Sequence, residues 1–275
     1  MPDFDFQGHT VHYEAAGDGV PLVMLHCGGS SGRQWDKVGD CLGDGFRRIT
    51  PDFYGFGATS RWRDGPTLSH DDQAALVAAV MEQESLGSAH VIGHSYGGAC
   101  AVRLYRACPE RVESLVLIEP VLTNLIREAG DPELHKEGFD IAYRFLQLAA
   151  AGREEAAWRE FIDHHNGPGK WDALSERARD RFLAQTAPTA DGFHSNIGNP
   201  TTLADCRRIT VQTTILCSET TAPYSRRVTE ILRDEIPGAE WIEIPGAGHM
   251  SPLTHPEAVA GLISAHLLPP ARGST

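Results

Sequence analysis

Residues Gly93–Gly98 have the sequence GHSYGG. It has the form G-x-S-x-G and stands between an apolar run at 89–92 and a segment of helical character at 98–108. A strand that turns into a helix in this way exposes the serine hydroxyl, and the glycines let strand and helix approach closely. The helix N-terminus also offers backbone N–H groups to an oxyanion. Ser95 is therefore the candidate nucleophile, and a glycine-rich turn without chemistry is the alternative.

Strands and helices alternate on both sides of this turn. A hairpin is expected around Gly8, and further strands are expected at 21–26, 48–50, 89–92, 115–118, 213–217 and 240–244. Helices are expected near Trp35, over 73–84 after a cap at Ser69, over 98–108 and 225–235, and from Pro256. Near-continuous apolar strands that alternate with helices predict an α/β fold. We expect a mostly parallel central sheet of about eight strands, flanked by helices.

Residues 121–206 interrupt this alternation. They have helical periodicity, several aromatic side chains and no convincing strand. We therefore expect a helical cap (lid) at 121–206, inserted after the sixth strand, and a core domain made of 1–120 and 207–275. Trp158 and Trp171 are expected in the core of the cap and not as a platform for substrate.

Charge and composition exclude several functions. The 275 residues carry a net charge of −13, which disfavours nucleic acid and anionic membranes as partners. Transmembrane runs and the features of a secretory signal are not found, and the six cysteines are scattered without a CxxC pair. We expect a cytoplasmic protein with reduced thiols that acts on a small molecule. The oligomeric state, a homo-oligomer included, stays open.

A serine nucleophile needs a general base, because its hydroxyl is a weak acid. Thirteen histidines are available, and His249 has the best context. It lies in the glycine-rich loop 245–252, directly after the last expected strand, where the strand ends of an open α/β sheet meet at the ligand crevice. His249 is therefore the candidate base, and an ordinary surface-loop histidine is the alternative.

Four segments together resemble the α/β-hydrolase family: 26–35, 52–59, 93–98 and 246–249. Their order and spacing match, so the resemblance covers nearly the whole chain. It implies that backbone N–H groups of Gly28 and Tyr96 form the oxyanion hole. Cys27 stands where the family has a glycine, which changes the side chain of this loop but not its N–H groups.

The acidic member of the expected catalytic triad departs from the family pattern. The family usually carries an Asp after the strand at 213–217, and Thr221 occupies that place here. Glu119, at the tip of the strand 115–118, is our first candidate, since one branch of the haloalkane dehalogenases keeps its acid there. Glu219 and a triad without a carboxylate remain as alternatives. A carboxylate buried at a strand tip needs a partner, and a histidine N–H is suitable.

These residues predict a serine hydrolase that works by acyl transfer on a small ester, thioester or lactone, without metal or cofactor. The pair His164–His165 lacks an evident third ligand for a metal. Cleavage of a C–C bond beside a ketone and cofactor-free perhydrolysis stay open within this class. A catalytically weak or inactive small-molecule binding protein of the same fold is the alternative outside it, and Thr221 in place of Asp is its best support.

Overall fold

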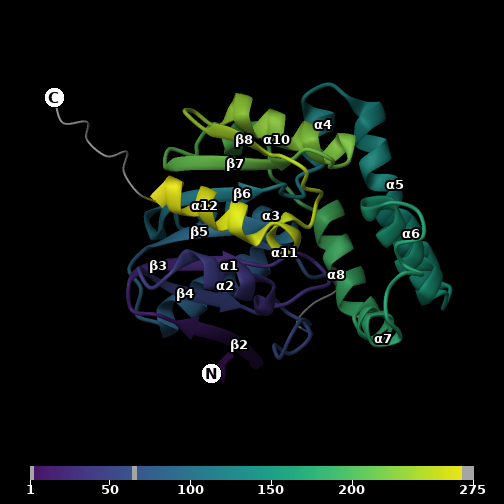
Figure 1. Cartoon of the computed structure of the whole chain (residues 1–275), viewed down its shortest axis with the longest axis horizontal. Helices are drawn as coiled ribbons and strands as arrows, with labels where there is room; N and C mark the ends of the chain where they lie inside the picture. The colour runs from purple at the N-terminus through teal and green to yellow at the C-terminus, as the bar shows by residue number, and fades with distance from the viewer. Residues whose placement is uncertain (1–2, 64–66, 268–275) are drawn as a thin grey trace.

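The centre of the computed structural model, which describes residues 3–63 and 67–267, is one eight-stranded sheet (Figure 1). Its strands lie in the order β1-β2-β4-β3-β5-β6-β7-β8. They are β1 (Asp3–Phe6), β2 (His9–Ala16), β3 (Val20–Leu25), β4 (Phe46–Pro51), β5 (Ala89–His94), β6 (Val112–Ile118), β7 (Gln212–Ser218) and β8 (Glu240–Ile244). The six strands from β3 to β8 are parallel, and β1 and β2 form the expected hairpin at one edge. The predicted α/β fold with a mostly parallel sheet is confirmed.

Helices cover both faces of the sheet. The core helices are α1 (Asp36–Leu42), α2 (His70–Gln83), α3 (Tyr96–Ala107), α10 (Pro223–Glu235), α11 (Ser251–Thr254) and α12 (Pro256–Leu267), with short 3-10 turns η1 (Gly32–Trp35) and η2 (Pro109–Arg111). Ser69 caps α2 as predicted, since its hydroxyl accepts the Asp72 N–H while the Asp72 carboxylate accepts the Ser69 N–H. The short helix α11 was not expected. Among the described residues, no helix combines the length and apolar character needed to cross a bilayer.

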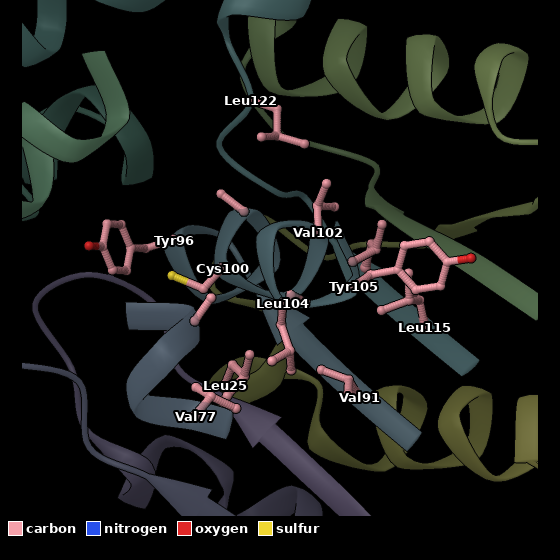
Figure 2. Packing of buried hydrophobic residues seen from close by; sticks show 14 of the residues in the cluster. Leu25, Val77, Val91, Tyr96, Cys100, Val102, Leu104, Tyr105, Leu115 and Leu122 are labelled. Atoms are coloured by element: carbon pink, nitrogen blue, oxygen red, sulfur yellow. The ribbon is translucent and has the colours of Figure 1, made fainter. Parts of the chain in front are cut away.

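Two hydrophobic clusters hold the helices to the sheet. Because side chains alternate along a strand, Leu115 and Leu117 of β6 join one cluster, whereas Val116 and Ile118 join the other. The first cluster includes side chains of α2, α3 and α10, and the second those of α1 and α12. Figure 2 shows buried side chains of the first cluster around α3. Strands that are buried on both faces explain the near-continuous apolar runs in the sequence.

Six helices lie between β6 and β7 in the chain. They are α4 (Asn124–Glu128), α5 (Pro132–Ala150), α6 (Glu154–Asn166), α7 (Glu176–Ala184), α8 (Thr186–Ile197) and α9 (Leu203–Cys206). Helices α5 to α8 stand beyond one end of the strands, with α8 next to the sheet (Figure 1). Trp158 and Trp171 are buried within a third hydrophobic cluster built from these helices, as expected. We propose that this helical segment acts as a lid.

The turn from β5 into α3 depends on close backbone contacts. A Cβ atom on Gly97 would lie 2.3 Å from the Leu25 carbonyl oxygen, and one on Gly93 would lie 2.5 Å from the Gly97 carbonyl oxygen. Helix α3 begins at Tyr96, two residues before the expected start at Gly98. The reason is that Ser95 alone reverses the chain with its left-handed φ of 54°. The following glycines are thus needed for packing inside the helix and not for the turn.

We predict that Gly97→Ala lowers the free energy of unfolding by at least about 2 kcal/mol, because the new methyl group meets backbone that cannot move aside. The matched control is Gly261→Ala in α12, where a Cβ would meet no atom within 4 Å. That variant should raise stability by up to about 1 kcal/mol through lower chain entropy in the unfolded state. Urea unfolding measures the free energy of unfolding of both variants, and equal values would contradict the packing role of Gly97.

Candidate active site

Ser95 lies at the sharp turn between β5 and α3. Its N–H donates to the Ile118 carbonyl of the neighbouring strand β6 at 2.9 Å, and the residue is 7% exposed. A non-glycine residue with positive φ is strained unless its surroundings hold it in place. Here the strand partner and the start of α3 hold the backbone, so the hydroxyl is presented at the carboxyl end of the sheet.

A continuous hydrogen-bonded chain joins Ser95, His249 and Glu119. The Ser95 Oγ lies 3.0 Å from His249 Nε2, and His249 Nδ1 lies 2.6 Å from Glu119 Oε2. These side chains come from the ends of β5 and β6 and from the loop after β8. If Nδ1 carries the proton, it donates to the carboxylate and leaves Nε2 free to accept the serine proton. The three residues selected from the sequence therefore meet in the geometry of a nucleophile, a base and an orienting acid.

Glu119 is fully buried and fully hydrogen-bonded. Besides His249, it accepts the Ser218 N–H at 2.6 Å and the Thr221 hydroxyl at 2.8 Å. Burial alone would raise the pKa of Glu119, but these hydrogen bonds and the nearby imidazole lower it to about 2. The residue has a left-handed φ of 43°, which is uncommon for glutamate. The local backbone is thus held in an unusual conformation that turns this carboxylate toward His249.

The alternative acid Glu219 points elsewhere. Its carboxylate accepts the Gly246 N–H at 2.6 Å and so ties the β7 loop to the loop of His249. Thr221, which occupies the usual place of an Asp, donates its hydroxyl to Glu119 instead of meeting the imidazole. The position that usually carries an Asp in the family therefore still contributes to the chain of hydrogen bonds. Its neutral threonine side chain helps to hold the Glu119 carboxylate.

Gly28 and Tyr96 lie side by side near Ser95. A Cβ built on Gly28 would be 3.9 Å from the Tyr96 Cβ. In the part of the chain that the structure describes, the N–H groups of Gly28 and Tyr96 have no acceptor, whereas the Cys27 N–H donates to Gln34 Oε1 at 3.0 Å. Two free N–H donors beside a serine hydroxyl can hold an oxyanion.

Helices α6 and α8 cover the segment 26–31 between β3 and η1, which contains Gly28 and Gly29 and which we call the oxyanion loop. A Cβ on Gly29 would lie 3.3 Å from the ring of Trp158 and 3.9 Å from the Thr189 hydroxyl. Gly192 of α8 packs against the Tyr96 ring in the same way, at 3.6 Å. Trp158 thus has two roles, since it is part of the helical core and also closes over the oxyanion loop. The second role was not predicted, because sequence periodicity identifies buried positions but not their distant partners.

Four buried or partly buried histidines surround the site and are neutral. Burial lowers the pKa of His26 and His70 to about 4 and that of His94 and His165 to about 3. His165 accepts the Tyr224 hydroxyl at 2.8 Å, and its ring centroid lies 5.7 Å from that of His249. No group of three or more His, Cys, Asp or Glu side chains within 3–63 and 67–267 is placed to hold a metal ion.

We predict that stability falls as the pH drops below about 6.5, the pKa of an unperturbed histidine. Below this pH the four histidines bind protons in the unfolded chain but stay neutral in the folded protein, because burial lowers their pKa values there: His26, His70, His94 and His165. The contribution of these neutral histidines to the free energy of unfolding is fully present above pH 6.5 and is lost as the pH falls toward 4. Urea unfolding between pH 7.5 and 4.5 measures this, and His70→Asn should make the dependence shallower. A constant free energy of unfolding across this range would contradict it.

Comparison with known proteins agrees with the fold. A family model described as the Alpha/beta hydrolase family matches residues 22–262. Lipase LipV of Mycobacterium tuberculosis is 26% identical over 288 aligned positions, which cover 95% of this chain and 98% of that protein. The 2-hydroxy-6-oxo-6-phenylhexa-2,4-dienoate hydrolase of Comamonas testosteroni is 30% identical over 125 positions, 42% of each chain.

The fold itself has close counterparts among solved structures. The crystal structure of MGS-M2, an alpha/beta hydrolase enzyme from a Medee basin deep-sea metagenome library, superimposes with a TM-score of 0.82 over 100% of both chains at 19% identity. At this identity the likeness concerns the fold alone. The family model, by contrast, spans most of the chain and includes every strand from β4 to β8. The chain belongs to the alpha/beta hydrolase family.

Proposed function

We propose that this hydrolase uses Ser95 as a nucleophile in acyl transfer, with His249 as general base and Glu119 as the acid that orients it. The observation that carries the proposal is the unbroken chain of hydrogen bonds Ser95–His249–Glu119, at 3.0 Å and 2.6 Å. A serine hydroxyl is a poor nucleophile unless a base removes its proton during attack. The named hydrolase and lipase relatives support hydrolysis as the reaction class.

The proposed reaction has two halves. His249 Nε2 takes the proton of Ser95 as its oxygen attacks the substrate carbonyl, and the Gly28 and Tyr96 N–H groups stabilise the oxyanion. The imidazolium then gives the proton to the leaving group, which departs and leaves an acyl-serine. Water, deprotonated by the same imidazole, attacks this ester; the bond between the acyl group and the Ser95 oxygen breaks, the acid leaves, and the imidazolium returns the proton to Ser95. Glu119 stays ionised throughout, in keeping with its lowered pKa.

A small, uncharged acyl compound suits this site best, so we propose an ester, thioester or lactone. Trp158 and Thr189, which lie over Gly29, are neutral, and so is Gly192, which packs against the Tyr96 ring. Among the described residues, none of the hydrogen-bond, ring or close contacts of Ser95 and His249 involves lysine or arginine. The dienoate that names one relative is an anion, and burying its charge would require such a partner.

A binding protein without catalysis is the weaker alternative. Its main support was the neutral Thr221 at the usual place of an Asp. Because Glu119 lies against His249 and Thr221 donates to Glu119, this substitution does not break the chain of hydrogen bonds. A pure binding site also has no use for a base held beside a serine hydroxyl.

We predict that a fluorophosphonate forms one covalent adduct per chain, at Ser95. Such a probe needs an activated serine but no knowledge of the substrate. Intact-mass analysis measures the adduct, and Ser95→Ala should remove it without loss of the fold. If folded wild-type protein stays unmodified, the proposed nucleophile is wrong, and a thermal-shift screen for ligands would follow.

We predict that Glu119→Gln lowers the rate of fluorophosphonate labelling by orders of magnitude. The change keeps the side-chain shape but removes the charge that stabilises the imidazolium, and the analogous Asp→Asn change in serine proteases costs about 10⁴-fold. The matched control is Glu219→Gln, in the loop after β7, because its amide oxygen can still accept the Gly246 N–H. It should label within a few-fold of the wild-type rate. Normal labelling of folded Glu119→Gln would remove this residue from the mechanism.

A further inference from the structure

A second chain of hydrogen bonds crosses the site behind the catalytic residues and passes through His94. The Cys27 N–H donates to Gln34 Oε1 at 3.0 Å, and Gln34 Nε2 lies 3.1 Å from His94 Nδ1. His94 Nε2 lies 2.8 Å from the carbonyl oxygen of His249. This bridge therefore connects the oxyanion loop to the loop that carries the general base, although the two loops are more than two hundred residues apart in the chain.

Every donor and acceptor in the bridge has only one consistent role. A backbone N–H can only donate, so the Gln34 oxygen must face Cys27 and its NH₂ group must face His94. His94 Nδ1 must then accept, which places the ring proton on Nε2 and directs it at the His249 carbonyl. A second proton on Nδ1 would point at the Gln34 NH₂ group.

The surroundings keep His94 in this neutral form. The side chain is fully buried, and the ionisable groups that act on it are His249, Glu119 and His26. Burial and the nearby His249 lower the pKa of His94 to about 3, against a smaller opposing effect of Glu119. The bridge therefore stays in one protonation state over the pH range in which His249 would work as a base.

The two ends of the bridge hold groups that the proposed reaction uses. At one end, Gln34 fixes the N–H of Cys27 while His26 Nδ1 holds its carbonyl at 2.7 Å. Because a peptide unit is planar, fixing the Cys27 carbonyl also fixes the direction of the Gly28 N–H on the same unit. At the other end, the bond to the His249 carbonyl fixes the backbone from which the imidazole extends.

We propose that His94 is a positioning residue that sets the oxyanion loop and the His249 loop in register with each other; this rests on the serine hydrolase function proposed above. His94 touches neither the nucleophile nor the substrate carbonyl in this scheme. It acts through Gln34 on one side and through the His249 backbone on the other. Errors of about 1 Å in such positions can cost roughly 10²-fold in rate, so one buried side chain can matter for both halves of the site.

Two substitutions separate the ends of the bridge. In His94→Asn, the amide oxygen replaces Nδ1 as acceptor for Gln34, but no donor reaches the His249 carbonyl. In His94→Gln, the longer amide supplies the donor to His249 and loses the acceptor near Gln34. With p-nitrophenyl butyrate as probe, we expect each variant to lose roughly tenfold or more in kcat with little change in KM. Only His94→Asn should also change the pH–rate profile, because it removes the bond that holds the backbone of the general base.

His266→Asn is the matched control. His266 is also buried and also bonds through both nitrogens, to Thr214 and Ser114, but these residues lie near the opposite ends of their strands from the site. It should lower stability and leave kcat and the pH profile unchanged. Folded His94 variants with wild-type kcat and pH profile would overturn the positioning role.

Nuclear magnetic resonance gives a readout that needs neither activity nor a folded variant. In ¹⁵N-histidine-labelled wild-type protein, His94 should be the neutral Nε2–H tautomer, with an exchange-protected proton, down to pH 5. A charged ring or an Nδ1–H tautomer would overturn the bridge. A wild-type protein that fails to react with fluorophosphonate would refute the proposed function instead, and the tautomer would still decide whether the bridge exists.

Discussion

The carboxylate of Glu119, buried at the tip of β6, is the group on which the site depends. Removing a charge from water is costly, and the cost is recovered only if every oxygen finds good donors. Three donors from separate segments do this: the Ser218 N–H, the Thr221 hydroxyl and the His249 ring. One carboxylate thereby fixes the end of β7, the loop after it and the loop after β8. The same contacts lower the pKa of Glu119 to about 2, which favours the ionised carboxylate at neutral pH.

The parallel sheet explains how these groups meet. Ser95, Glu119 and Ser218 stand at or just after the ends of β5, β6 and β7, which are neighbours in the sheet. Two of them, Ser95 and Glu119, have left-handed backbone conformations. Strain of this kind persists only where the surrounding structure holds it, and it is concentrated at functional sites. The sheet thus supplies rigidity, while the helices α6 and α8 shape the space above the oxyanion loop.

Much of this arrangement could be predicted from local sequence. Apolar strand runs and the glycine-rich turn at Ser95 identify the parallel sheet, because burial on both faces and close backbone approach restrict which residue types can stand at consecutive positions. Glu119 was a reasonable candidate acid, since a charge at the end of a buried strand needs a partner. The bridge through Gln34 and His94 could not be predicted, because Gln34 lies 60 residues from His94, His94 lies 155 residues from His249, and no local pattern marks them. Trp158 likewise could be assigned to a core, but not to the loop it covers.

Proton magnetic resonance of the resting protein, labelled with ¹⁵N at histidine, tests whether Glu119 orients His249. We expect a far-downfield proton bound to His249 Nδ1, because the hydrogen bond to Glu119 is short and charge-assisted. That resonance should be absent in Glu119→Gln and present in Glu219→Gln. If the His249 proton instead resides on Nε2, or resonates in the ordinary imidazole range, then Glu119 does not orient the base.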